Sequence, residues 1–121
     1  MKTPTDPRHL NRIHAFKAIF AHSFTPQEIE NELAAQTLEK LTEIDPIIVK
    51  CAPDWPLSQI NRVDLSILRL ALFELLFMPS TPTKVIIDEA IELAKRYGGQ
   101  SSSSFVNGAL ASALKYTNRE A

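Results

Sequence analysis

The sequence is poor in the residues on which many catalytic and metal sites depend. It contains one cysteine, Cys51, and three glycines. A single cysteine forms no internal disulfide and completes no zinc or redox motif, which favours a reducing compartment. The glycines are Gly98, Gly99 and Gly108, and their spacing does not make a phosphate-binding loop. We therefore expect no metal and no other cofactor.

Long hydrophobic runs are also missing. No stretch reaches the length of a membrane span, and the first seven residues lack the apolar core of a signal peptide. With 45% hydrophobic and 22% charged residues, the composition is that of a globular protein. We expect a cytoplasmic protein with no membrane partner.

Charge of one sign does not dominate, but it is unevenly spread. The net charge is −1. Residues 1–24 carry four basic residues against one acidic residue, together with all three histidines, whereas residues 25–48 carry six acidic residues against one lysine. A basic leading segment suggests a localised anionic partner, although a solvated helix face explains the same charges.

One stretch, residues 63–77, is apolar in eleven of its fifteen positions. Wound as a helix, it is apolar around nearly its whole circumference, which is typical of a helix buried by its neighbours. Asn61 is suited to cap its start, and Pro79 to end it. Arg69 and Glu74 then need partners from other helices, because an unpaired buried charge is costly.

Helical periodicity recurs along the chain, and strand-like alternation is absent. The sequence predicts an all-α fold, a compact bundle of six or seven helices in two small helical subdomains. It forms a single domain over residues 1–121, with a trimmed N-terminal helical part at 6–52 and a C-terminal helical part at 55–116. Trp55 is expected to close the base of the bundle. The other expected elements are a helix from Asp6 to about His22, a second from Thr25, a short apolar turn at 47–49, and helices at 84–97 and after the serines at 101–104.

The sequence shows no recognisable set of catalytic residues, because the histidines lie far in sequence from any candidate nucleophile and no pair of carboxylates stands out. A binding site is better supported. Residues 98–108 join two helices through a loop rich in N–H and hydroxyl groups, and the start of the last helix is suited to an anion. There Phe105 could stack on a base. The alternative, which the residue types alone favour, is that the serines only cap the helix and Phe105 belongs to the core.

Several motifs together resemble the C-terminal half of the NusB transcription antitermination factor family, from Trp55 to about Leu114. Residues 12–20 resemble the first helix of the same family more weakly. The motifs in the C-terminal half are Asn-Arg-Val-Asp at 61–64, Ile-Leu-Arg-Leu-Ala at 67–71, Phe-Glu-Leu at 73–75, Ile-Asp-Glu-Ala-Ile-Glu-Leu-Ala-Lys at 87–95, Tyr-Gly at 97–98 and Phe-Val-Asn-Gly at 105–108.

This resemblance implies a non-enzymatic, all-helical RNA-binding protein. Such proteins bind boxA-like single-stranded RNA together with a small-subunit ribosomal protein, NusE, within the RNA polymerase antitermination complex, and thereby promote ribosomal-RNA transcription. Relatives include monomers and homodimers, so the resemblance leaves the oligomeric state open.

The resemblance also implies site residues. Phe20, where relatives usually have tyrosine, and Asp64 match positions that meet the protein partner or the edge of the RNA, whereas Arg69, Glu74 and Glu89 match internal positions. We expect the basic leading segment and the start of the last helix to form one cradle for RNA. Its RNA-binding residues are Lys2, Arg8, His9, Arg12, Gln100, Ser101, Ser102 and Phe105.

Two alternatives remain. The chain could be a protein-interaction module of the same fold whose RNA binding is weak or lost, because its basic segment is thin. It could also serve an enzyme, since NusB-like domains occur fused to RNA cytosine methyltransferases. No methyl-donor loop is found in these 121 residues, so that activity would need another chain.

Overall fold

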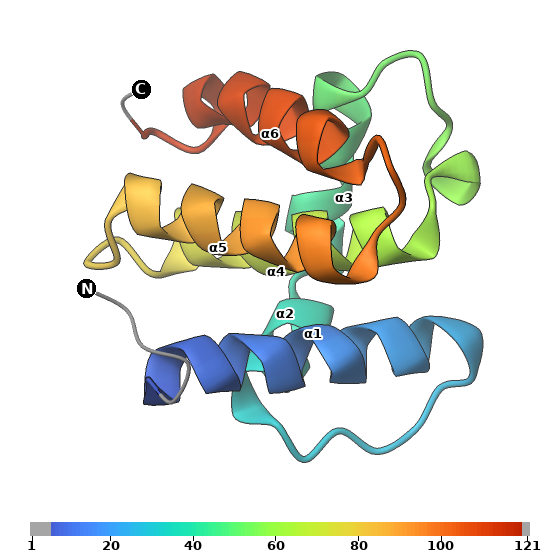
Figure 1. The fold of residues 1–121 in the computed structure, drawn as a ribbon, viewed down its shortest axis with the longest axis vertical. Coiled ribbons are helices and arrows are strands. Elements are labelled where there is room, and N and C mark those ends of the chain that lie inside the picture. Colours follow the sequence, from blue (N-terminus) through green and yellow to red (C-terminus); the bar gives the residue numbers. More distant parts are fainter. Residues whose placement is uncertain (1–5, 120–121) are drawn as a thin grey trace.

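The computed structural model describes residues 6–119, and within that range its regular elements are all helices, which confirms the predicted all-α fold (Figure 1). The elements are α1 (Pro7–Phe24), α2 (Glu32–Glu39), α3 (Leu41–Cys51), the 3-10 helix η1 (Leu57–Gln59), α4 (Arg62–Phe77), α5 (Thr83–Tyr97), α6 (Ser102–Ala113) and the 3-10 helix η2 (Leu114–Tyr116). Over these residues, no helix combines the length and the apolar character that a bilayer crossing requires.

Helix α4 is the centre of the molecule, as its apolar circumference predicts. It contacts every other α-helix, and ten of its sixteen residues are buried. The Asn61 side chain caps it by accepting hydrogen bonds from the backbone N–H groups of Val63 and Asp64. The helix ends at Phe77, two residues before Pro79, because the residue preceding a proline disfavours helical geometry.

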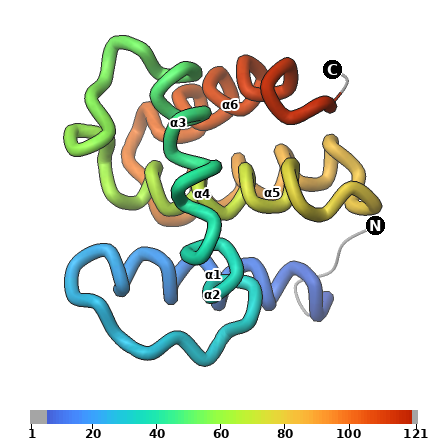
Figure 2. The backbone as a smooth tube through the Cα atoms, turned by 180° about the vertical axis from the view of Figure 1, so that it is seen from behind, coloured from blue at the N-terminus to red at the C-terminus, as the bar shows by residue number. Residues whose placement is uncertain are grey.

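The other helices surround α4 in two ways. Helices α1, α5 and α6 lie roughly side by side as three rods, with α5 between the other two (Figure 1). Seen from behind, α3 crosses the long axis of α4 and connects the side carrying α1 and α2 with α6 (Figure 2). The buried apolar residues of all these helices form one continuous core.

Arg69 and Glu74 are each paired with a charged side chain of another helix, which confirms their expected need for partners. Arg69 Nε and Nη2 donate to the two carboxylate oxygens of Asp45 on α3, at 3.0 and 2.9 Å. Glu74 accepts from Arg12 on α1. The C-terminal carbonyls of α4 are also satisfied, because the Arg119 guanidinium donates to the carbonyl oxygens of Glu74, Leu75 and Met78.

The segment between α1 and α4 differs from its prediction. Residues 25–31 are not helical, and α2 begins only after Asn31, whose side-chain oxygen accepts from Ala34 N–H. Helix α3 then runs through Pro46 instead of restarting there. A proline within a helix removes one backbone hydrogen bond, and the burial of Ile44 and Ile48 on either side holds this helix against the core.

Trp55 was expected to close the base of the bundle, and this is wrong. Its exposed fraction is 52%. Pro53 and Pro56 flank it and keep the segment out of any helix, so that Trp55 is not carried on an element facing the core. Ala52 and Ile60, each 5% exposed, are the buried apolar residues on either side of this loop.

Candidate nucleic-acid interface

The first turn of α1 presents one exposed cation. Asp6 caps the helix by accepting from Arg8 N–H at 2.9 Å, and Pro7 at the first helical position loses no needed hydrogen bond. The Arg8 side chain is 84% exposed and pairs with the Asp6 carboxylate at 3.4 Å. The side-chain hydrogen bond from Arg8 lowers the pKa of Asp6. Arg8 is therefore accessible to a phosphate; Lys2 lies outside the described residues.

Arg12 is inside the fold, and this corrects its prediction as a phosphate contact. It is 8% exposed, its Nε lies 3.0 Å from each Glu74 carboxylate oxygen, and its Nη2 lies 2.9 Å from Oε1. Its Nη1 is 3.6 Å from Glu89 Oε1. Burial alone would lower the pKa of Arg12, but the hydrogen bond and charge of Glu74, followed by Glu89, raise it. Arg12 joins α1 to α4 and α5.

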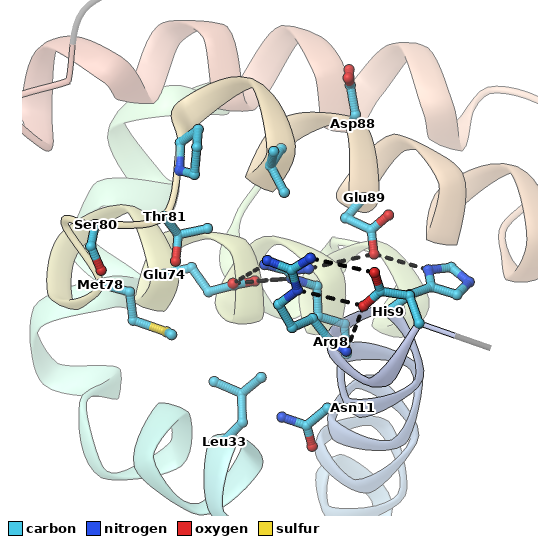
Figure 3. Close-up of a pocket in the computed structure, with 14 residues that line it drawn as sticks. Arg8, His9, Asn11, Leu33, Glu74, Met78, Ser80, Thr81, Asp88 and Glu89 are labelled. Carbon is cyan, nitrogen blue, oxygen red and sulfur yellow. Dashed lines mark hydrogen bonds and ion pairs between the residues drawn. The ribbon is translucent and has the colours of Figure 1, made fainter. Parts of the chain in front are cut away.

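His9 lies between these two arginines and is largely covered. Its Nδ1 is 2.9 Å from Glu89 Oε1, and its side chain is 11% exposed. The pair lies at one side of a cavity of about 620 Å³ between α1, α2 and the α4–α5 junction. In Figure 3, His9 and Glu89 point toward each other, whereas Asp88 on the same helix points away. The part of His9 that a ligand could reach is therefore small and lies at the edge of this cavity.

The start of α6 divides its predicted residues into two kinds. Gln100 and Ser101 are exposed, and the Ser101 side chain makes no capping hydrogen bond. Ser102 is 4% exposed, and its Oγ accepts from Gly99 N–H at 2.9 Å. Phe105 is half-buried against the core. Gln100, Ser101 and one side of Phe105 can meet a ligand, whereas Ser102 holds the loop.

The two candidate segments do not adjoin. The start of α1 lies against the first half of α5, where His9 bonds Glu89, whereas α6 begins beyond the end of α5. Figure 1 shows the two segments at opposite ends of the α1–α5–α6 side. A fifteen-residue helix is about 22 Å long. The expected compact cradle is therefore wrong, and an RNA strand touching both segments would have to run along α5.

The far end of α1 carries Phe20, a predicted partner residue, together with an exposed aromatic residue, Phe24, that the sequence analysis did not single out. Phe24 is 58% exposed, and its ring centroid is 4.9 Å from that of the half-buried Phe20. The Arg62 guanidinium lies 4.3 Å from the centroid of the Phe24 ring. We call Phe20, Phe24 and Arg62 the aromatic cluster. The four-residue spacing of the two phenylalanines was the signal for it.

Asp64, the second predicted partner residue, is 7% exposed. Its Oδ1 has no hydrogen-bond partner among the described residues. Its carboxylate therefore offers little surface to a partner protein, whereas Asn61 and Arg62 at the same helix start are exposed.

Metal-ligating side chains meet at one place in the described chain. His9, Glu89 and Glu92 each offer a ligand atom, and these atoms lie within 4.8 Å of one another. His9 and Glu89 are eighty positions apart in the sequence, so no local motif predicts the group.

Comparisons with known proteins agree on one family. The model of the NusB family matches residues 25–115. The transcription antitermination protein NusB of Lachnoclostridium phytofermentans is 45% identical over 111 residues, covering 90% of this chain and 84% of that protein. The NusB protein of Thermotoga maritima is 40% identical, and the alignment covers 91% of this chain and 89% of that protein.

Solved structures give the same result. A structure of T. maritima NusB superposes with a TM-score of 0.83 at 37% identity, covering 95% of this chain and 93% of that one. A structure of the antitermination factors NusB and NusE in complex with dsRNA shares the fold, with a TM-score of 0.79 at 23% identity and coverage of 90% and 96%. With matching helices, matching motifs and near-complete coverage, this chain belongs to the NusB family.

Proposed function

We propose that this protein is a transcription antitermination factor that binds RNA together with a NusE-like ribosomal protein. The observation that carries the proposal is family membership, since the family match spans residues 25–115 and the curated relatives are named transcription antitermination proteins. The NusB–NusE complex with dsRNA suggests both partners. We further propose that boxA-like single-stranded RNA is the ligand, that ribosomal-RNA transcription is the process served, and that the protein acts in the cytoplasm without catalysing a reaction.

The geometry supports RNA contacts at both ends of α5. Arg8 would bind a phosphate, and His9 would contact RNA at the cavity edge. At the other end, Gln100 and Ser101 would hydrogen-bond to the strand while Phe105 offers part of its ring to a base. Unpaired RNA fits such a divided site, because its bases are available for stacking and its backbone follows the protein surface. The aromatic cluster, exposed near the end of α1, is suited to the protein partner.

Replacing Arg8 with alanine is expected to weaken binding of a boxA-like single strand severalfold and to reduce the salt slope of the affinity by about 1, because one phosphate contact is lost. The measurement is filter binding at several salt concentrations, against the boxA-like strand, a scrambled strand and a duplex. Lys50→Ala removes an equal charge from the last turn of α3, where Lys50 Nζ lies 5.2 Å from the centroid of the Tyr116 ring, and should leave binding unchanged. Coincident curves for Arg8→Ala and the parent protein would remove Arg8 from the site.

A second function is favoured by one observation. Because Arg12 is withdrawn into the core, Arg8 is the only exposed arginine or lysine among residues 6–16. Each missing phosphate contact weakens RNA binding, so the chain could act chiefly as a protein-interaction module.

A pull-down with the NusE-like protein, with and without RNA, separates the two functions. Binding of the partner that RNA does not strengthen supports the interaction module. In either case Phe24→Ala, which removes the exposed ring of the aromatic cluster, should weaken partner capture.

A further inference from the structure

The His9–Glu89–Glu92 group joins the first turn of α1 to the middle of α5. His9 and Glu89 are already in contact at 2.9 Å, and Glu92 lies one turn further along α5. Residues three positions apart are neighbours on one helix face, so both carboxylates approach the imidazole from the same side. We propose that these three side chains form a binding site for a divalent transition-metal ion of the zinc type.

The ligand types suit such an ion. Zinc accepts imidazole nitrogen at about 2.0–2.1 Å and carboxylate oxygen at about 2.0–2.2 Å, commonly through three protein ligands and one water. Ligand atoms around one tetrahedral ion lie about 3.4 Å apart at those bond lengths. Here they are within 4.8 Å of one another, so small side-chain rotations bring them into range. A nitrogen ligand with two carboxylates favours zinc over calcium or magnesium, which prefer all-oxygen shells.

The charge balance also suits a divalent cation. Glu89 and Glu92 would bring two carboxylates to the ion, and both also take part in other interactions within the protein. The nearby Arg12 does not need Glu89 as its partner, because it forms a closer, multiply hydrogen-bonded pair with Glu74 at 2.9–3.0 Å. Arg12 Nη1, 3.6 Å from Glu89 Oε1, would orient the ligating carboxylate, as outer groups do in known metal sites.

The surroundings leave room for the remaining ligand. His9 and Glu89 both line the cavity of about 620 Å³, so water can reach the ion from that side. Glu92 is exposed at the outer edge, which provides the entry path. Because His9 and the carboxylates come from different helices, a bound ion would clamp α1 to α5. His9 is also one of the proposed RNA contacts, but the metal site does not require RNA.

The experiment is a titration of the metal-stripped protein with Zn²⁺ by calorimetry, accompanied by thermal unfolding with and without Zn²⁺. We expect one ion per chain and a raised Tm, since a ligand that binds the folded state stabilises it. Co²⁺ should give a visible absorption spectrum characteristic of nitrogen and oxygen ligands.

Matched variants decide the assignment. Glu92→Gln alters an exposed side chain, and His9→Ala removes the nitrogen ligand; each should weaken Zn²⁺ binding at least about tenfold. His14→Ala, which removes an exposed histidine of the same helix, should bind Zn²⁺ like the parent. Absence of one-to-one binding, or equal binding by parent and Glu92→Gln, would overturn the proposal. So would loss of binding in His14→Ala, because the ion would then sit elsewhere.

Discussion

Replacing Arg12 with alanine is expected to lower the free energy of unfolding by about 3–5 kcal/mol. The reason is that Glu74, which is 2% exposed, would keep a charged carboxylate in the core without its cation. Glu89 would lose a neighbouring positive charge at the same time. Urea unfolding followed by circular dichroism measures the change, and a lower midpoint with an unchanged slope shows that stability, not compactness, was affected.

Two further variants separate a buried ion pair from a surface contact. Arg8→Ala removes an exposed arginine from the same helix and should change stability by less than about 0.5 kcal/mol. The double variant Arg12→Leu with Glu74→Leu should recover most of the loss, because apolar residues of similar volume often replace a buried pair without penalty. If Arg12→Ala unfolded at the same urea concentration as the parent protein, the Arg12–Glu74 ion pair would not contribute to stability. Parent-like RNA binding by the folded double variant is expected, since neither side chain reaches the surface.

The central helix could be predicted from sequence because its signals are local and agree with one another. Asn61 caps α4, Pro79 follows its end, and the apolar residues between them leave no polar face. Burial then required partners for Arg69 and Glu74. Sequence alone could not say which cation would pair with Glu74, because Arg12 lies 62 positions away.

Arg12 shows why the candidate RNA site was harder to predict. Its position in a basic helix start is equally compatible with a phosphate contact and with a buried pair. What decides between them is which face of α1 packs on α4, and that depends on tertiary contacts. Ser102 is a similar case, since a serine beside a helix start could face solvent or, as here, accept a hydrogen bond from Gly99 within the loop.

The sequence analysis also placed the start of the second helix too early, at Thr25, whereas α2 begins after Asn31. Thr25 and Pro26 form a plausible helix start, but Asn31 provides a cap and its side-chain amide donates to Asn11 of α1. That long-range bond has no local signature. The grouping of His9 with Glu89 and Glu92 likewise arises only when α1 is laid against α5.

Replacing Gly98 with alanine is expected to destabilise the protein by about 1–3 kcal/mol, the usual cost of forcing extra atoms into a packed site. The backbone here is extended, with φ −90° and ψ −176°, so glycine is not needed for its conformation. It is needed for space, because an added Cβ would lie 2.5 Å from Ser102 Cβ and 2.7 Å from the Ala94 carbonyl oxygen. Neither atom is the mobile end of a long side chain, so α5 and α6 would have to separate.

The other two glycines are internal controls for that argument. An added Cβ at Gly99 or Gly108 meets nothing within 4 Å. Gly99→Ala should therefore be close to neutral, and Gly108→Ala should stabilise α6 by about 0.5–1 kcal/mol through helix propensity. Thermal unfolding of the three variants measures this order. Equal stability for Gly98→Ala and Gly99→Ala would show that the α5–α6 junction can accommodate an added Cβ at residue 98. In that case, close packing around Ser102 would not explain why Gln100 and Ser101 lie at the surface at this end of the candidate RNA site.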